Sequence, residues 1–480
     1  MGNTPQFEAA LRIVQTLRAR KFEAYLAGGC VRDLLLGREP ADYDVATSAT
    51  PDVVLDMFPL TFAVGAHFGV VLVAPETKDA GFVTEVATFR SDLAYSDGRH
   101  PDAVRYTTSA EEDVQRRDFT INGLLLDPPC IDPLRPARRG SLLGECVRDP
   151  KLLRSAVIDC VGGLADLDAG VVRAIGRPKL RFEEDHLRML RAVRFAARFG
   201  FELDPETQRA IRSLARRIHA VSRERVRDEL TKMLTEGHAR RAFELLDETG
   251  LLAEVLPKIQ DMKGVEQPPQ FHPEGDVWIH TLMLIEQLPP GCSMTLAWGA
   301  LLHDVGKPPT FRRAPDRIRF DGHVEIGVAI AAEICRGFRF SNEETRQVLA
   351  LVENHMRFMD APRMKASTLK RFFRLDRFDE HLALHRMDCL AASGNLENWE
   401  FVRERFSSMP EEAVRPQPLI TGRELIAAGY APGAGFREML RAAEDAQLEG
   451  TVTTAEEALQ LVRERFPSGA NPSSAKIALE

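Results

Sequence analysis

The chain has 480 residues, a length that suggests about three or four domains, and its 44% apolar and 28% charged residues are typical of a globular protein. Its seven cysteines form no CxxC pair, which excludes a disulfide framework and a zinc ribbon and fits a reducing cytoplasm. The net charge of −8 argues only weakly against a nucleic-acid ligand, since the distribution of charge matters more than its sum.

Nothing in the chain predicts a membrane partner. No apolar run approaches the roughly 20 residues needed to span a bilayer. The first residues lack the basic-then-apolar pattern of a signal peptide. We therefore expect a cytoplasmic protein.

Residues 1–160 show a mixed pattern. Residues 6–20 have the apolar spacing of a helix, and β-rich runs separated by Gly, Pro and Asp follow up to residue 90. These runs predict a small α/β head domain. The polar stretch 91–117 is typical of a loop, and the Pro- and Arg-rich stretch within 128–155 is typical of an insertion or linker.

The remainder is almost wholly helical in pattern. We expect a helical neck and body over residues 161–262, with a helix stop at Gly200. A linker at 265–275 leads into a second helical domain over 272–405, and a small helical tail follows over 415–468.

Charge is uneven within the helical part. Between Arg177 and Arg241 basic residues outnumber acidic ones. This excess suits a phosphate-backbone ligand, and it suits a solvated helical face equally well.

The stretch AGGCVRDLLLGREPADYDVATS, residues 27–48, places two carboxylates one residue apart. In a strand, Asp42 and Asp44 would project to the same face and repel each other unless cations lay between them. Magnesium prefers such hard oxygen ligands, and two ions can clamp both oxygens of a phosphoryl displacement. Glu85, in the strand-like run VTEVATF, is a candidate third carboxylate.

Other residues around this pair point to a phosphate. Gly28 and Gly29 would let the backbone approach a triphosphate, and Arg32 supplies a cation. A lone D-x-D after Pro40 would be read as a polar turn. Here it is accompanied by GG-x-VRD upstream and RRDFTINGLLLD downstream.

The ordered set GG-x-VRD, D-x-D, RRDFTIN and EEDHLRMLRAVRF resembles the class II CCA-adding enzymes and bacterial poly(A) polymerases of the polymerase-β-like nucleotidyltransferase superfamily. The resemblance runs from about Tyr25 to Leu256. It implies an α+β fold, with a nucleotidyltransferase head followed by a helical neck and body. It also implies the following roles: Asp42 and Asp44, with Glu85, bind catalytic Mg²⁺; Gly28, Gly29 and Arg32 hold the triphosphate; Arg116 and Arg117 contact phosphates; Asp118 contacts the ribose; and Asn122 lies nearby.

The motif EEDHLR predicts how a base could be chosen without a template. On a helix, Asp185 and Arg188 would share a face. A carboxylate accepts from the exocyclic amine of cytosine or adenine, and a guanidinium donates to the same edge, whereas guanine and uracil would leave an acceptor facing an acceptor. The family's EDxxR motif selects CTP and ATP, which implies a nucleotide-binding set of Glu184, Asp185, Arg188 and Arg191. The alternative is a surface ion pair.

Two further stretches are similar to the family. Enzymes of this family that add the terminal A carry a flexible loop at the position of FRSDLAYSDGRHPDAVRY, so A addition is expected here. The run DCVGGLADLDAGVVRAIGRPKLRF is similar to the family's hinge. The stretch 128–155 is longer than the family's compact pattern, so its role stays open.

A second set of polar residues lies in the helical domain. Mixed His and Asp ligands from several helices suit a divalent transition metal such as Mn, Ni, Fe or Zn. Their order resembles the HD phosphohydrolase superfamily, with a metal-free, degenerate HD fold as the alternative. The residues concerned are His280, His303, Asp304, His323, His355 and Asp388, with Lys307 nearby.

The C-terminal glycines allow two interpretations. The run ITGRELIAAGYAPGAGF is similar to the tail of HD-bearing relatives, a resemblance that implies contact with RNA. Helix capping alone would explain the same glycines.

Together these features predict a tRNA nucleotidyltransferase that adds CCA to the 3′ acceptor end from CTP and ATP, with an HD phosphohydrolase activity besides. The alternatives are a poly(A) polymerase and an HD phosphohydrolase whose N-terminal unit binds RNA. The oligomeric state is left open.

Overall fold

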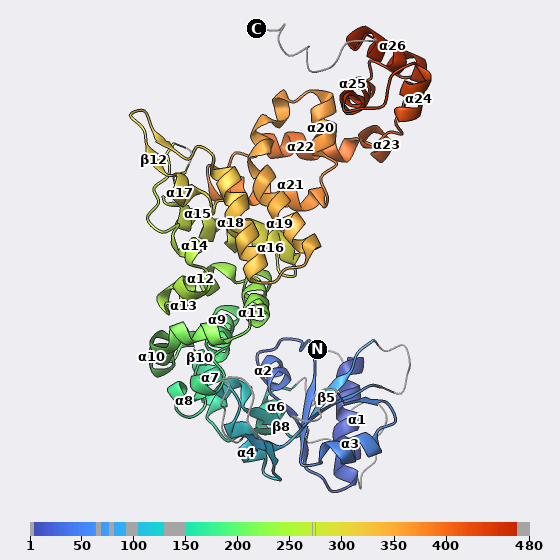
Figure 1. Cartoon of the computed structure of the whole chain (residues 1–480). Helices are drawn as coiled ribbons and strands as arrows, with labels where there is room; N and C mark the ends of the chain where they lie inside the picture. The colour runs from blue at the N-terminus through green and yellow to red at the C-terminus, as the bar shows by residue number, and fades with distance from the viewer. Residues whose placement is uncertain are drawn as a thin grey trace. The chain divides into compact units, whose positions relative to one another are not determined.

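A computed structural model describes residues 4–63, 69–75, 81–92, 104–128, 149–270, 272–273 and 275–467 (Figure 1). Within the stretch 91–117, expected to be a loop, residues 93–103 lie outside the described residues, and the remainder is not all loop, because it contains the strand 104–106 and the helix 110–115. Most of the stretch 128–155 also lies outside the described residues. The chain divides into two compact units, Met1–Pro257 and Lys258–Glu480. No helix among the described residues is long and apolar enough to cross a membrane.

The first unit begins with a mixed sheet whose described strands run in the order β3-β4-β5-β2-β1-β8-β9. Strand β2 pairs antiparallel with β1 and parallel with β5. A separate hairpin joins β6 and β7. The strands are β1 (Ala24–Ala27), β2 (Asp44–Thr47), β3 (Thr61–Phe62), β4 (Val70–Val73), β5 (Thr84–Thr88), β6 (Arg90–Asp92), β7 (Val104–Tyr106), β8 (Leu124–Leu126) and β9 (Val157–Asp159).

Alternation along the strands divides the core of the head into two layers. Leu26 and Val45 pack in one cluster with the helix expected at 6–20, whereas Ala27 and Ala46 pack in another with Phe89. The Thr4 hydroxyl caps that helix by accepting a hydrogen bond from the backbone of the third helical residue. The helices of this part are α1 (Pro5–Ala19), α2 (Gly29–Leu35), α3 (Pro51–Met57), α4 (Ala110–Gln115), η2 (Thr120–Asn122) and α6 (Pro150–Ser155).

The rest of the first unit is helical, as expected. Gly200 ends a helix in the left-handed conformation, with φ of 69°. Two short strands, β10 (Val171–Val172) and β11 (Glu202–Leu203), pair in parallel. The helices are α7 (Gly163–Ala169), α8 (Pro178–Glu184), α9 (Arg188–Phe199), α10 (Pro205–Leu214), η3 (Ala215–Ala220), α11 (Arg223–Thr235), α12 (Ala239–Glu248), α13 (Leu251–Val255) and, at the division between the units, α14 (Pro257–Gln260).

The second unit is helical apart from the short hairpin of β12 (Arg312–Arg313) and β13 (Ile318–Arg319). Its end has its own apolar cluster, which includes Leu425, Met439 and Val462. The helices are α15 (Val277–Glu286), α16 (Met294–Leu302), α17 (Lys307–Thr310), α18 (His323–Gly337), α19 (Asn342–Asn354), η4 (His355–Arg363), α20 (Ala366–Phe372), α21 (Phe378–Ala391), α22 (Glu397–Ser408), α23 (Glu411–Val414), α24 (Gly422–Ala427), α25 (Gly435–Glu449) and α26 (Ala455–Arg465). The expected α+β fold is confirmed.

Candidate functional sites

The D-x-D pair lies at the entrance of β2. The strand begins at Asp44, so Asp42 precedes it rather than lying within it. The side chains still alternate, because Asp42 is exposed, Tyr43 is buried against Phe7 with ring centroids 5.3 Å apart, and Asp44 is half-buried. Both carboxylates therefore face away from the core.

Glu85 joins this pair from the neighbouring strand. The parallel register matches Val45 with Val86, which places Glu85 beside Asp44. Burial, together with the negative charges of Asp42 and Glu85, raises the pKa of Asp44 to about 7, while Arg117 opposes the rise. A carboxylate cluster of this kind is stabilised by cations, and its hard oxygen donors fit magnesium.

Gly28 adopts a conformation that favours glycine. It caps α2 with φ of 74°, and its amide donates to the Leu124 carbonyl at 3.0 Å. A Cβ at this position would lie 2.9 Å from Nη1 of Arg117. The absence of a side chain at Gly28 thus allows Arg117 to approach the backbone here.

Arg32 is not available to a phosphate in this structure, contrary to the sequence expectation. Its side chain is 4% exposed and donates to Asp33 at 2.8 Å and to the amide oxygen of Asn122. The guanidinium also lies 4.5 Å from the ring centroid of Phe199 in α9. Arg32 therefore links α2 to the RRDFTIN segment and to α9.

The two arginines of RRD share one buried carboxylate. Asp113, 1% exposed, accepts from Arg116 at 2.6 Å and from Arg117 at 3.1 Å. Burial alone would raise the pKa of Asp113, but the two guanidinium groups outweigh it and lower the pKa. The arginines are thus held at the head while each remains partly exposed.

Asp118, expected to contact a ribose, is already engaged by protein donors. It accepts from the Asn122 amide at 3.0 Å and from the Phe119 backbone amide at 2.8 Å. Its other oxygen accepts twice from Arg191, at 2.9 and 2.6 Å. Burial would raise the pKa of Asp118, but Arg191 and Asn122 lower it to about 2.

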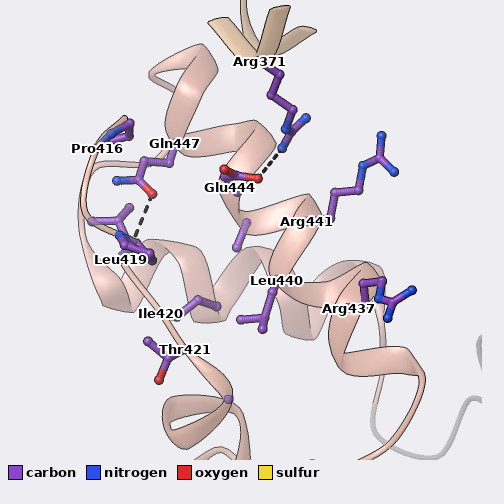
Figure 2. Close-up of a pocket in the computed structure, with 13 residues that line it drawn as sticks. Arg371, Pro416, Leu419, Ile420, Thr421, Arg437, Leu440, Arg441, Glu444 and Gln447 are labelled. Carbon is purple, nitrogen blue, oxygen red and sulfur yellow. Dashed lines mark hydrogen bonds and ion pairs between the residues drawn. The ribbon is translucent and has the colours of Figure 1, made fainter. Parts of the chain in front are cut away.

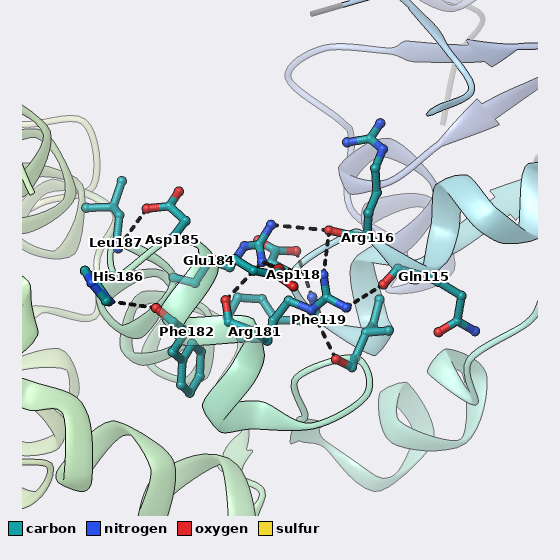
Figure 3. Close-up of polar contacts among 12 residues, drawn as sticks. Gln115, Arg116, Asp118, Phe119, Arg181, Phe182, Glu184, Asp185, His186 and Leu187 are labelled. Atoms are coloured by element: carbon teal, nitrogen blue, oxygen red, sulfur yellow. Dashed lines mark hydrogen bonds and ion pairs between the residues drawn. The ribbon is translucent and has the colours of Figure 1, made fainter. Parts of the chain in front are cut away.

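The EEDHLR motif spans a break between two helices, so the expectation of one continuous helix is wrong (Figure 3). Helix α8 ends at Glu184, Asp185 is extended with φ of −142°, and α9 begins at Arg188. The cause is local: the Asp185 carboxylate accepts from the Leu187 backbone amide at 3.0 Å, as a capping side chain does at the start of a helix.

Asp185 and Arg188 also have separate partners. Arg225 in α11 donates to Asp185 at 2.9 Å. Arg188 donates to Glu184 at 2.6 Å and to the Arg116 carbonyl at 3.3 Å. The pairing of Arg225 with Asp185 could not be predicted from the sequence, because a contact across 40 residues leaves no local signal.

Arg181, in helix α8, connects this helix to the head. Arg181 donates to the backbone carbonyls of Gln115 at 2.7 Å and Arg116 at 3.2 Å, as Figure 3 shows. The nucleotide-binding candidates of α8 and α9 are therefore joined to the RRD segment by hydrogen bonds.

Part of the basic excess between Arg177 and Arg241 forms internal ion pairs. Arg194 is buried and donates to buried Glu229 at 2.7 Å. Arg198 lies 3.5 Å from Glu236, and Arg227 lies 2.8 Å from Asp228. These arginines serve the helical core and its surface, and they are not simply an open phosphate-binding stripe.

The second set of candidates converges in the helical unit from five elements. His280 lies in α15, His303 and Asp304 follow α16, His323 begins α18, His355 begins η4, and Asp388 lies in α21. Ligand atoms of His280, His303 and Asp304 all lie within 4.8 Å of one another, and so do those of Asp304, His323 and His355. His280 Nε2 also lies 3.0 Å from the Asp388 carboxylate. The structure thus brings all six predicted residues together.

Close helix packing makes this convergence feasible. A Cβ at Gly306 would clash with the His323 carbonyl, and one at Gly299 would lie 2.6 Å from Leu351. The absent side chain of Gly299 lets α19 approach α16, and that of Gly306 lets α18 approach the turn that carries His303 and Asp304 after α16.

Backbone carbonyls orient three of the imidazole rings. The Nδ1 atoms lie 2.9 Å from the Ala300 carbonyl for His303, 2.9 Å from Phe320 for His323, and 2.7 Å from Val352 for His355. Each Nδ1 therefore donates, and each Nε2 presents a lone pair. The Nε2 atoms of His323 and His355 are buried without a hydrogen-bond partner among the described residues. These orphaned atoms fit a metal ion.

The charge states also suit a cation. Burial lowers the pKa of His355 to about 4, so its ring is neutral at pH 7. Burial would raise the pKa of Asp304, but His303 and Lys307 hold it well below the usual range. Lys307 Nζ lies 2.7 Å from Asp304. The site therefore offers a neutral imidazole at His355 and an ionised carboxylate at Asp304, and divalent transition metals take donors of both kinds.

A cavity of about 660 Å³ lies in the tail (Figure 2). Arg371 lies beside it and pairs with Glu444 at 2.6 Å. Arg437 and Arg441 line it from α25. The tail glycines include positions at helix ends, with Gly422 opening α24 and Gly435 opening α25, so helix boundaries account for these two.

Three family models match the chain. A poly A polymerase head domain matches residues 24–173. A probable RNA and SrmB-binding site of polymerase A matches residues 200–263, and an HD domain matches residues 277–391.

Curated relatives give the same assignment. The CCA-adding enzyme of Geobacillus sp. (strain WCH70) is 41% identical over 258 residues, which are 54% of this chain and 56% of the relative. That of Lactobacillus johnsonii is 36% identical over 288 residues, 59% of this chain and 65% of the relative. The matched part thus spans between half and two thirds of these relatives.

Solved structures extend the similarity to nearly the full length. The Bacillus stearothermophilus CCA-adding enzyme in complex with CTP is 28% identical, with a TM-score of 0.69, and the match covers 96% of this chain and 98% of that one. The Thermotoga maritima CCA-adding enzyme complexed with tRNA shares the fold, with 17% identity, a TM-score of 0.56 and 96% coverage of both chains. Over nearly its full length the chain is therefore similar to a CCA-adding enzyme of solved structure, and separate segments of it match a poly A polymerase head domain, a probable RNA-binding site of polymerase A and an HD domain.

Proposed function

We propose that this protein adds CCA to the 3′ end of tRNA from CTP and then ATP, without a template. The observation that carries the proposal is the placement of Asp44 between Asp42 and Glu85, with Arg117 facing the same carboxylate. This arrangement suits magnesium ions and a polyphosphate at one edge of the sheet. When bound, Mg²⁺ would stabilise negative charge on the transferring phosphoryl group.

The residues of the head would then align the reactants. Gly28 and Gly29 would admit the triphosphate to the backbone, and Arg116 and Arg117 would contact its phosphates. The tRNA 3′-hydroxyl oxygen forms a bond to the α-phosphorus, the bond to the β-phosphate oxygen breaks, and pyrophosphate leaves while the hydroxyl proton passes to solvent. Arg32, which donates to Asn122, would hold the RRDFTIN segment in position.

Base selection is assigned to the break between α8 and α9. Asp185 would accept from the exocyclic amine of cytosine or adenine, and Arg188 would donate to the same edge. Both side chains exchange partners to do so, since Arg225 and Glu184 hold them in the structure. Arg191 would act indirectly, by fixing Asp118.

We also propose the division into a head (1–160), a neck and body (161–262), an HD domain (272–405) and a tail (415–468). The basic residues of the neck and body that remain exposed would contact the tRNA acceptor arm through its phosphates. Recognition of double-stranded RNA depends largely on such backbone contacts.

One assay tests this function against its competitors. The protein is incubated with Mg²⁺ and a tRNA transcript that ends at the discriminator base, with CTP and ATP singly or together. Growth by three nucleotides only when both are present supports the proposal. Long A tails with ATP alone indicate a poly(A) polymerase, and no extension indicates an HD phosphohydrolase whose N-terminal unit binds RNA.

A second activity is favoured by the inward lone pairs of His323 and His355. We propose that the HD site holds a divalent transition metal (Mn, Ni, Fe or Zn) and hydrolyses a phosphoester. Hydrolysis of a 2′,3′-cyclic nucleotide that requires the metal and fails in Asp304→Ala supports this. The double variant Asp42→Ala with Asp44→Ala would lose tRNA extension and keep the hydrolysis, and loss of both activities would contradict two independent sites.

A further inference from the structure

The segment between helices α14 and α15 does more than connect these two helices. The sequence predicts a linker at 265–275, yet its ends are fixed to each other. Gly264 donates its amide to the Asp276 carboxylate at 2.6 Å, and Glu266 forms a β-bridge with Asp276. Asp276 also caps α15, the helix that carries His280. The segment is therefore clamped at the start of a helix of the HD site.

Gln267, in this clamped segment, is 3% exposed. Its Oε1 accepts a hydrogen bond from Lys307 Nζ at 2.6 Å. The same Nζ lies 2.7 Å from the carboxylate of Asp304. Lys307 therefore contacts both the Gln267 carboxamide and the carboxylate of Asp304, a candidate metal ligand.

The other end of this carboxamide has no hydrogen-bond partner. Gln267 Nε2 is buried without one among the described residues. A buried amide N–H group without an acceptor is unfavourable, and most buried polar groups in native proteins have partners. A ligand with oxygen acceptors, placed beside Lys307, would satisfy it.

We propose that Gln267 contacts the phosphoryl group of the substrate at the HD site, with Oε1 holding Lys307 in place and Nε2 donating to a non-bridging phosphate oxygen. The inference rests on the proposed phosphohydrolase function of that site. Lys307 supplies a positive charge, and the neutral amide adds a directed donor that favours an anionic tetrahedral ligand over water. The ligand class is a phosphomonoester or phosphodiester, and inorganic phosphate is its simplest member.

A purely structural role is the competing explanation, in which Gln267 only holds Lys307. Two variants separate the roles. Gln267→Met keeps the size and removes both donor and acceptor, while Gln267→Glu keeps an acceptor for Lys307 and removes the donor. Gln270→Glu, three residues on and exposed, is the matched control for the charge change.

The test uses the full-length protein loaded with Mn²⁺ and measures binding of inorganic phosphate by calorimetry. We expect Gln267→Met and Gln267→Glu each to weaken phosphate binding by about tenfold or more, since one hydrogen bond to a charged group is lost. Manganese affinity, measured by competition with a chelator, should match the wild type. The Gln270→Glu control should bind phosphate normally.

Other outcomes would overturn the inference. Normal phosphate binding by Gln267→Met refutes the inference and leaves the proposed phosphohydrolase function standing. Normal phosphate binding by Gln267→Glu also refutes the inference, because it would mean that Gln267 only holds Lys307. A loss of phosphate affinity explained wholly by lost manganese affinity also refutes it. If the manganese-loaded wild type binds no phosphate, the proposed phosphohydrolase function falls as well.

Discussion

Asp118 accepts two hydrogen bonds from Arg191, at 2.9 and 2.6 Å, across 73 residues of sequence. The contact joins the RRD segment of the head to helix α9 of the neck. Asp118 is buried, and its second oxygen is held by Asn122 and the Phe119 amide. The position of Asp118, the ribose candidate, is therefore fixed by a residue of helix α9.

Replacing this carboxylate should destabilise the first unit in a pH-dependent manner. Asp118→Ala leaves the Arg191 guanidinium without its partner, at an expected cost of about 2 kcal/mol at pH 7. The folded pKa of about 2 lies below the unfolded value of about 4, so the stabilisation is present above pH 4 and is lost as the pH falls toward 2. Urea unfolding followed by circular dichroism at pH 7 and pH 3 checks this, and an equal difference at both pH values would contradict it.

Asp44→Asn should raise the stability of the metal-free protein and abolish its activity. The folded pKa of Asp44 is about 7, above its unfolded value, so its ionised form destabilises the metal-free fold as the pH rises from about 4 to 7. Asn removes that charge, and we expect the metal-free variant to be about 1–3 kcal/mol more stable at pH 8, with no gain at pH 4. The same variant should lose tRNA extension. A variant that is less stable at pH 8 would refute the carboxylate cluster.

Asp185→Asn should relax base selection. The amide that replaces the carboxylate offers a donor where the exocyclic amine of cytosine or adenine needs an acceptor. Discrimination against UTP should fall by about tenfold to a hundredfold, which corresponds to about 1–3 kcal/mol for one unpaired buried group. Incorporation rates for CTP, ATP and UTP measure it. Asp228→Asn, an exposed aspartate of α11, is the matched control and should keep the wild-type preference.

The adjacent glycines at the start of α7, Gly162 and Gly163, should respond differently to alanine. A Cβ at Gly163 would clash with the Thr120 carbonyl of the RRDFTIN segment, and it would lie 2.9 Å from a Leu124 methyl. Gly162 has φ of 78° and open space around it, so alanine there costs only about 1 kcal/mol of conformational strain. We expect Gly163→Ala to lower the free energy of unfolding by at least twice as much as Gly162→Ala. Equal effects in urea unfolding would contradict the close approach.

Removal of the metal from the HD site should destabilise the second unit. The chain's three tryptophans, Trp278, Trp298 and Trp399, all lie in that unit, so their fluorescence reports its unfolding selectively. Mn²⁺ at 100 times its dissociation constant should stabilise this transition by about 2.7 kcal/mol, and a chelator should abolish the gain. The double variant His323→Ala with His355→Ala should show no gain, and a gain that survives in it would place the metal elsewhere.

Local patterns predicted the elements well, and long-range contacts account for what they missed. The helical spacing of residues 6–20 and the positive φ of Gly200 depend on neighbours in sequence. The break at Asp185 is an exception, a local effect that the spacing of EEDHLR does not reveal, because the Asp185 carboxylate accepts from the Leu187 amide in competition with the helix. The burial of Arg32 against Phe199 gave no local signal, because it depends on packing with α9. Gln267 gave no signal at all, since its partner Lys307 lies 40 residues away.

The carboxylate of Asp113 beneath Arg116 and Arg117 has a consequence for turnover. Two cations over one anion leave a single net positive charge, held on side chains that have already lost much of their rotational freedom. Such a pair would bind a polyphosphate at little entropic cost and with only modest charge attraction. A site that is rigid but largely neutralised favours rapid exchange of ligands, which the proposed cycle of three additions would require.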